Sequence, residues 1–278
     1  MKLKHITAAI AIAAALLPGA AQAHRGWLLP SATVLSGTEP WVTVDAAISN
    51  DLFYFEHVAM GLDNLVVFTP DGSPGKAENA AKGRYRSTFD VKLSQPGTYK
   101  IAVVNNGANA SFKVDGVQKR VRAASLEALA AQIPANAQEV QVSVSAGRNE
   151  IFVTSGKPTD KVLAPTGQGL ELVPITHPND LTAGETAQFR FVLDGKPAAN
   201  IAVTVIPGGI RYRDKLGEIK LTSDAEGKIS VKWPEPGMYW LSAAPARDPN
   251  APRTAEAGTL DKPARRASYV TTLEVLAQ

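Results

Sequence analysis

Short stretches of alternating apolar and polar residues, separated by turn residues, recur through most of this 278-residue chain. The clearest stretch is 85–93, and others occur at 98–104, 186–193 and 267–276. A period of two residues places one side of a strand in a core and the other side in water. Many short strands joined by turns that contain Gly and Pro are typical of antiparallel β-sandwiches. The sequence therefore predicts an all-β protein.

The strands fall into two series, which we interpret as two antiparallel β-sandwich domains of Ig-like or transthyretin-like type. The first domain is expected at residues 24–160 and the second at 170–278. Between them, the stretch 155–168 is rich in Gly, Pro, Lys and Thr, which indicates a linker or a long crossing loop. The polar, Pro-rich stretch 247–266 is expected to be a surface loop.

Two local signals refine this picture. Segment 125–133 is the one stretch with a helical composition, because Ser125 suits an N-cap and Pro134 stops a helix. The pair Asn106-Gly107, preceded by another asparagine, is a strong hairpin signal. We therefore expect one short helix, and a tight turn at the Asn-Gly pair.

Residues 1–23 have the features of a secretory signal peptide. Two lysines precede an uncharged apolar stretch at 6–17, and an Ala-Gln-Ala pattern of the kind that signal peptidases recognise follows. The apolar stretch is shorter than the roughly 20 residues that span a bilayer as a helix. We expect export to the periplasm and no membrane span after cleavage. Cleavage after Ala23 would leave His24 as the first residue.

Composition excludes several classes of function. The chain has no cysteine, which rules out thiol catalysis and thiolate metal sites. Its 29 basic and 26 acidic residues are interspersed, so nucleic acid is not an expected partner. The nucleophile elbow, the phosphate-binding loop and the zinc-protease helix motif are all missing from the sequence. We therefore expect a binding protein and not an enzyme.

Three histidines remain after the expected cleavage, and they are the candidate metal ligands: His24, His57 and His177. As a first residue, His24 would offer its imidazole and its free α-amine. Such an amine titrates near about pH 8, so a metal ion can displace its proton at neutral pH. Chelation by these two nitrogens favours Cu(II), Ni(II) or Co(II).

The other two histidines have weaker contexts. His57 lies in the most aromatic stretch of the chain, 51–60, where a neighbouring carboxylate could hold its tautomer and Met60 could act as a soft ligand for Cu(I). His177 lies at the entry to the second expected domain. Each could instead be a structural histidine that is half-buried or bonded to the linker. Sequence spacing alone does not bring the three together.

The segments HRGWLLPS at 24–31 and NDLFYFEH at 50–57 resemble a family of bacterial periplasmic proteins with an uncharacterised domain. That family is commonly described as a periplasmic component of nickel/cobalt uptake systems. The resemblance implies an exported protein that handles transition metals together with a metal transporter or an outer-membrane receptor, and it points to His24 and His57. Many members carry an acidic residue where this chain has Leu29, so no carboxylate ligand is expected there.

The second half resembles transthyretin-like, carboxypeptidase-regulatory-like modules. The resemblance rests on the turn at 194–197 and the Gly-Met-Tyr strand that begins at Gly237. It implies a packing and presentation role, and fold likeness alone implies no chemistry.

Three hypotheses follow. The first is a periplasmic protein that binds or delivers Ni, Co or Cu through His24, His57 and His177. The second is a metal-free structural or accessory module that docks on an envelope partner. The third is a copper oxygenase built on an amino-terminal histidine brace, for which the sequence shows no substrate platform.

Overall fold

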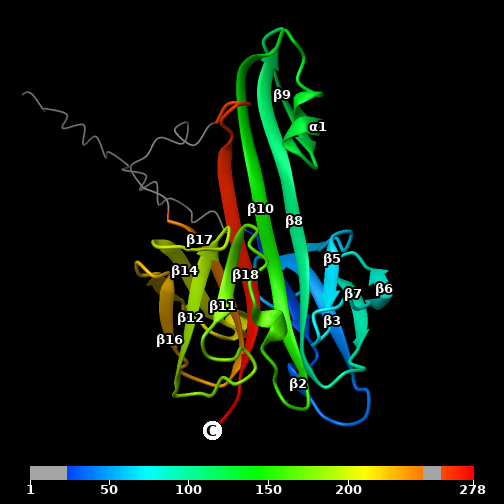
Figure 1. Ribbon diagram of the computed structural model, residues 1–278, viewed down its shortest axis with the longest axis vertical. Helices are drawn as coiled ribbons and strands as arrows, with labels where there is room; N and C mark the ends of the chain where they lie inside the picture. Colours follow the sequence, from blue (N-terminus) through cyan, green and yellow to red (C-terminus); the bar gives the residue numbers. More distant parts are fainter. Residues whose placement is uncertain (1–23, 247–257) are drawn as a thin grey trace, which may run out of the picture.

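The computed structural model describes residues 24–246 and 258–278, which form three β-sheets and one short α-helix (Figure 1). The protein is nearly all-β, as the sequence predicts. The expected signal peptide and residues 247–257 of the expected surface loop lie outside the described residues. In the described part of the chain, no helix is long and apolar enough to cross a membrane.

The first sheet has five strands and covers the amino-terminal half. Four of its strands follow one another in space, and a short fifth strand pairs with the second of them. These strands are β1 (Arg25–Pro30), β3 (Trp41–Ser49), β7 (Ser87–Lys92), β6 (Glu78–Lys82) and the short β4 (Val58–Ala59), which pairs with β3.

The second sheet has nine strands and runs through the whole molecule. In spatial order its main path is β15 (Ile219–Thr222), β14 (Ile201–Pro207), β17 (Gly237–Pro245), β18 (Ala264–Val275), β10 (Gln138–Ser155), β8 (Gly97–Val114) and β5 (Leu65–Phe68). Two further strands pair at its side, β2 (Val34–Leu35) with β10 and β9 (Val117–Ala123) with β8. The central pair of β10 and β18 is parallel, and it joins the two halves of the chain in one sheet.

The third sheet has four strands and covers the carboxy-terminal half. Its strands are β11 (Leu170–Pro174), β12 (Thr186–Leu193), β13 (Lys196–Pro197) and β16 (Lys228–Lys232). Two 3-10 turns complete the fold, η1 (Lys161–Leu163) within the expected linker and η2 (Ile210–Tyr212) after β14.

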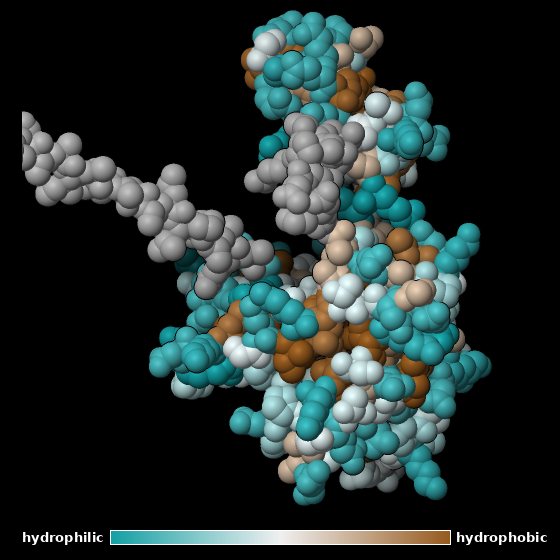
Figure 2. Space-filling model, turned by 90° about the vertical axis from the view of Figure 1, so that its left-hand side faces the viewer, coloured by the Kyte–Doolittle hydropathy of each residue, from teal (hydrophilic) through white to brown (hydrophobic). Residues whose placement is uncertain are grey.

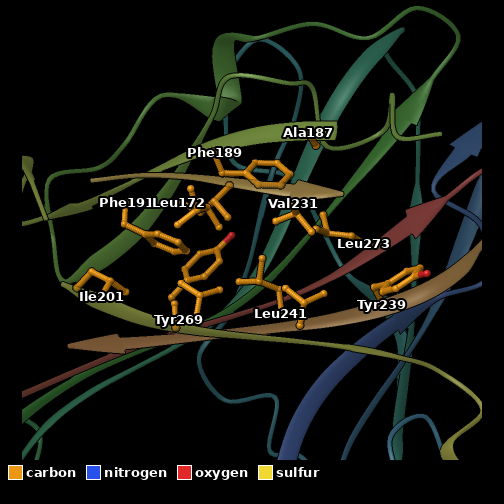
Figure 3. Packing of buried hydrophobic residues seen from close by; sticks show 14 of the residues in the cluster. Leu172, Ala187, Phe189, Phe191, Ile201, Val231, Tyr239, Leu241, Tyr269 and Leu273 are labelled. Carbon is orange, nitrogen blue, oxygen red and sulfur yellow. The ribbon is translucent and has the colours of Figure 1, made fainter. Parts of the chain in front are cut away.

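Two hydrophobic cores lie on opposite faces of the nine-stranded sheet. One core lies between this sheet and the first sheet and includes Phe89 and Ile151, both fully buried. The other lies between this sheet and the third sheet and includes Phe189 and Tyr269 (Figure 3). Tyr269 pairs with Arg148, which is three residues from Ile151 along β10. Because side chains alternate between the faces of a strand, Ile151 and Tyr269 point to opposite sides.

A projecting arm extends the long strands β8 and β10 beyond the two cores (Figures 1 and 2). We use "the arm" for residues 105–147, which include β9 and α1 (Leu126–Ala130). Ser125 caps this helix as predicted, because its side chain accepts a hydrogen bond from the amide of Ala128. The helix covers one face of the arm's strands through Leu129, which is fully buried.

One local expectation was wrong. No hairpin forms at Asn106-Gly107, because β8 continues through both residues and pairs with β10 there. The chain turns instead at Asp115-Gly116, where φ is 50° and 76° and both residues occupy the left-handed region that a tight hairpin requires. The strand that follows the helix, β10, is continuous from Gln138 to Ser155.

Candidate functional site

The structure brings His24 and His57 together. Their imidazole rings stack with centroids 3.8 Å apart and planes inclined by 5°. Both side chains are exposed. This is the one place in the described residues where two of the three predicted ligands meet. We call it the histidine pair.

Strand pairing explains why residues far apart in sequence meet here. β3 carries β1 along one edge and β4 on the other. Arg25 pairs with Ser49, and Val58 pairs with Ile48, so the residue before each of these short strands lies at the end of β3. Those two residues are His24 and His57.

The chain between β3 and β4 is held in place by backbone bonds. The carboxylate of Glu56 accepts hydrogen bonds from the amides of Asn50 at 2.7 Å and Asp51 at 3.0 Å. These bonds, with the Asp51 amide contributing most, lower the pKa of Glu56 below its ordinary value. Arg25 also donates to the carbonyl of Asn50 at 2.6 Å. The carboxylate next to His57 thus orders the loop and is not directed at the imidazole.

Aromatic packing fixes the same loop against the carboxy-terminal half. Trp27 is fully buried and makes an edge contact with Phe53 at 5.5 Å between ring centroids. Its indole nitrogen donates to the hydroxyl of Ser49 at 2.8 Å. From the other half of the chain, Trp240 donates to the carbonyl of Gly26 at 3.0 Å. The aromatic residues around His57 therefore form the seam between the two halves.

The orientation of the two rings determines whether they can hold one metal ion. Within residues 24–246 and 258–278, neither imidazole makes a hydrogen bond, and both are exposed. A metal bound to an imidazole nitrogen lies close to the plane of that ring, at about 2.0–2.1 Å for zinc. Two stacked, nearly parallel rings with centroids 3.8 Å apart do not share such a point. One ring must therefore rotate before both can hold one ion.

Met60 lies close by but is largely a core residue. Its side chain is 6% exposed and belongs to the amino-terminal core. A Cβ built on Gly26 would lie 3.2 Å from the methyl carbon of Met60, so the thioether packs tightly against β1. Glycine at position 26 leaves the space that Met60 fills.

His177 is not brought to the histidine pair. Its Nδ1 accepts a hydrogen bond from the amide of Asn179 at 3.1 Å, and its Nε2 lies 3.1 Å from the hydroxyl of Thr98. Burial is the largest cause that lowers the pKa of this half-buried histidine. Both ring nitrogens are thus engaged within the protein. The described residues contain no group of three His, Cys, Asp or Glu side chains able to hold a metal ion.

Sequence reasoning missed a buried cluster of charged groups between the two halves. Arg148 lies 3.4 Å from a carboxylate oxygen of Glu150 and 3.5 Å from one of Glu171. Tyr269 donates to Glu150 at 2.7 Å, and this contact and burial raise the pKa of its phenol well above the ordinary value, with burial contributing most. Burial also lowers the pKa of the neighbouring Lys100. The only signal in the sequence was the occurrence of charged residues within runs of strand-forming residues.

The comparisons with known proteins identify a family. A sequence profile for DUF4198, a domain of unknown function, matches residues 21–246. No curated protein matches the sequence.

Three of the similar solved structures are distant from this chain. The human OSCAR ligand-binding domain is 13% identical, with 91% of this chain and 99% of that chain covered, at a TM-score of 0.22. The D0-D1 domain of intimin is 14% identical, with 89% and 97% covered, at a TM-score of 0.20. The FN1-FN3 domains of chicken CNTN1 are 9% identical, with 88% and 97% covered, at a TM-score of 0.21. These likenesses carry nothing about function.

Proposed function

The chain belongs to the DUF4198 family of domains of unknown function, and we propose that it binds a divalent transition-metal ion through His24 and His57. The observation that carries the proposal is the 3.8 Å stacking of these two rings, which lie 33 positions apart in sequence. Two exposed imidazoles with no hydrogen bond among the described residues retain their nitrogen lone pairs for a ligand.

Processing of the chain would complete the site. If a signal peptidase cleaves after Ala23, the α-amine of His24 becomes a third nitrogen next to the two imidazoles. Three nitrogen donors of this kind suit Ni(II), Co(II) or Cu(II) better than calcium or magnesium, which prefer oxygen. We propose on this basis an exported protein that binds or delivers one of these ions for an uptake system. His177 is not needed for this site.

Isothermal titration calorimetry on the protein that begins at His24 tests the proposal. Titration with nickel, cobalt and copper salts should show one ion per chain. His24→Ala and His57→Ala should each weaken binding at least tenfold, which is about 1.4 kcal/mol. The matched control is His177→Gln, which should bind like the parent protein. Unchanged affinity in His24→Ala would rule out the proposed site.

A second comparison isolates the α-amine. A protein with one additional alanine before His24 keeps both imidazoles but converts the amine into a peptide nitrogen. It should bind more weakly than the processed protein and should release fewer protons on binding. Equal affinity of the two proteins would show that the imidazoles act without the amine. The absence of binding by both would favour a metal-free docking module.

A further inference from the structure

One face of the arm carries a continuous polar strip. In the pairing of β8 with β9 and β10, Asn109 lies beside Arg122 and Ser143, and Gly107 lies beside Ser145. On the other edge of β10, Ser145 pairs with Arg266 of β18. Residues paired in this way point to the same face of a sheet. We define the polar strip by Asn105, Asn109, Arg120, Arg122, Ser145 and Arg266.

Three neighbouring hollows follow the polar strip and share some of their lining residues. Their volumes are about 800, 660 and 380 Å³. The first and second share Asn109 and Arg122, the second and third share Asn105, and Ser145 lines all three. From Asn105 to Ser111, the strip follows six residue steps of β8, which span about 20 Å at roughly 3.3 Å per residue.

The opposite face of the same strands is covered. There the alternate residues Ala108, Ala110 and Phe112 pack beneath Leu129 of α1. The strip is therefore the outward face of a sheet whose inner face already has its own core. Its central residues Asn109, Ser143 and Ser145 are only partly exposed.

The charge of the strip is one-sided. Four arginines line the hollows, the exposed Arg120, Arg122 and Arg266 and the buried Arg148, and no Asp or Glu does so among the described residues. No ion pair to Arg120, Arg122 or Arg266 occurs in the described parts of the chain. The neighbouring Arg265, by contrast, is paired with Asp194. Arg122 donates from Nε to the side-chain oxygen of Asn109 at 2.8 Å, which leaves its two terminal nitrogens for another acceptor. With respect to the described residues, the three exposed guanidinium groups are thus available for carboxylates from outside the chain.

The lining chemistry selects the type of partner. Among the described residues, no aromatic side chain lines any of the three hollows, so these residues offer no platform on which sugars or bases could stack. Its Asn, Gln and Ser side chains can donate to and accept from a peptide backbone. We propose that the polar strip is the docking surface for an extended, acidic segment of a partner protein.

The lower end of the strip reaches the region of the histidine pair. The third hollow is bounded there by Gly26, Ile48 and Met60, and Gly26 is two residues from His24. A docked partner would therefore end beside the proposed metal site. The docking proposal does not rest on metal binding, because the arginines and the hollows are present whether or not an ion is bound.

Fluorescence anisotropy on the processed chain tests this proposal. The probe is a labelled peptide of alternating Glu and Ser, compared with the same peptide carrying Lys in place of Glu. The acidic peptide should bind and the basic peptide should not. The triple variant Arg120→Gln/Arg122→Gln/Arg266→Gln should bind the acidic peptide at least tenfold more weakly.

The matched control removes the same amount of charge elsewhere. Lys119→Gln/Arg84→Gln/Arg265→Gln also lowers the net charge by three and changes residues that line none of the hollows. It should bind like the parent protein. Equal loss of affinity in both triple variants would overturn the proposal, because it would show an unspecific charge effect. Retained affinity in the strip variant would overturn it as well.

Two further measurements keep the test decisive. If the strip triple variant does not fold, as judged by its circular dichroism, the single variant Arg266→Gln should still weaken binding while Arg265→Gln does not. Heparin is the probe for an anionic sugar, and it should compete poorly with the acidic peptide. Heparin binding that exceeds peptide binding and depends on the strip arginines would assign the surface to another class of partner and refute this one.

Discussion

Hydrogen bonds assign a single protonation state to His177. The amide of Asn179 donates to Nδ1, which must therefore be unprotonated, and Nε2–H can then donate to Thr98. Burial contributes most to lowering the pKa of this imidazole below its unfolded value of about 6.5. Protonation would break the bond to Asn179 in the folded protein only.

The stability of the protein should consequently depend on pH through His177. The free energy of unfolding should be highest above about pH 6.5 and should fall as the pH drops from there through the lower folded-state pKa. His177→Gln should reduce this decrease. Urea denaturation at a series of pH values measures this dependence of the free energy of unfolding. Equal pH dependence in His177→Gln and the parent protein would contradict the protonation state assigned to His177.

The histidines also show how far single residues can be interpreted from sequence. The candidate ligands could be chosen from residue chemistry, because an exposed amino-terminal histidine has a distinct set of donors. The meeting of His24 with His57 could not be predicted, because it depends on both short strands pairing with the end of β3. The position of His177 likewise depends on Thr98, which is distant in sequence.

At the level of elements, alternation predicted the class of fold but not the lengths of the strands. The Asn106-Gly107 pair is a turn signal only where the chain can leave the sheet. Here β10 offers continuous partners along β8, with Asn106 paired to Ala146 and Gly107 to Ser145. Backbone pairing over that length outweighs the local preference. The turn then forms at the next Asp-Gly pair.

The buried ion cluster between β10 and β11 should contribute more to the free energy of unfolding than an exposed ion pair does. Arg148 is 8% exposed and Glu171 is 2% exposed, and Nε of Arg148 has no hydrogen-bond partner among the described residues. Replacing Arg148 by Met would remove the guanidinium that pairs with two buried carboxylates, which then interact with Lys100 only through its more distant charge. We expect a loss of about 3–5 kcal/mol of unfolding free energy.

The control for this prediction is Arg265→Met, which removes the half-exposed ion pair with Asp194. A surface pair of this kind contributes about 0–1 kcal/mol. Chemical denaturation of the two variants compares them directly. Similar losses in both would show that the buried cluster contributes no more than an exposed ion pair.

For the whole molecule, the shared sheet implies that the two halves unfold together. The parallel pairing of β10 with β18 extends from Ser143 to Glu150, and residues from both halves bury Trp27 and Trp240 in one seam. Opening either core would expose one face of a sheet that the other core needs. The free energy of opening either core alone should therefore be close to the free energy of unfolding the whole protein.

Differential scanning calorimetry should show one transition in the parent protein. Leu28→Ala in the amino-terminal core and Leu241→Ala in the carboxy-terminal core both truncate fully buried side chains. Each should cost about 2–5 kcal/mol and lower the temperature of the single transition, because the remaining core cannot keep its half of the sheet without the other. If Leu241→Ala produced two separate transitions, with the amino-terminal core unfolding at its original temperature, the shared sheet would not couple the two halves.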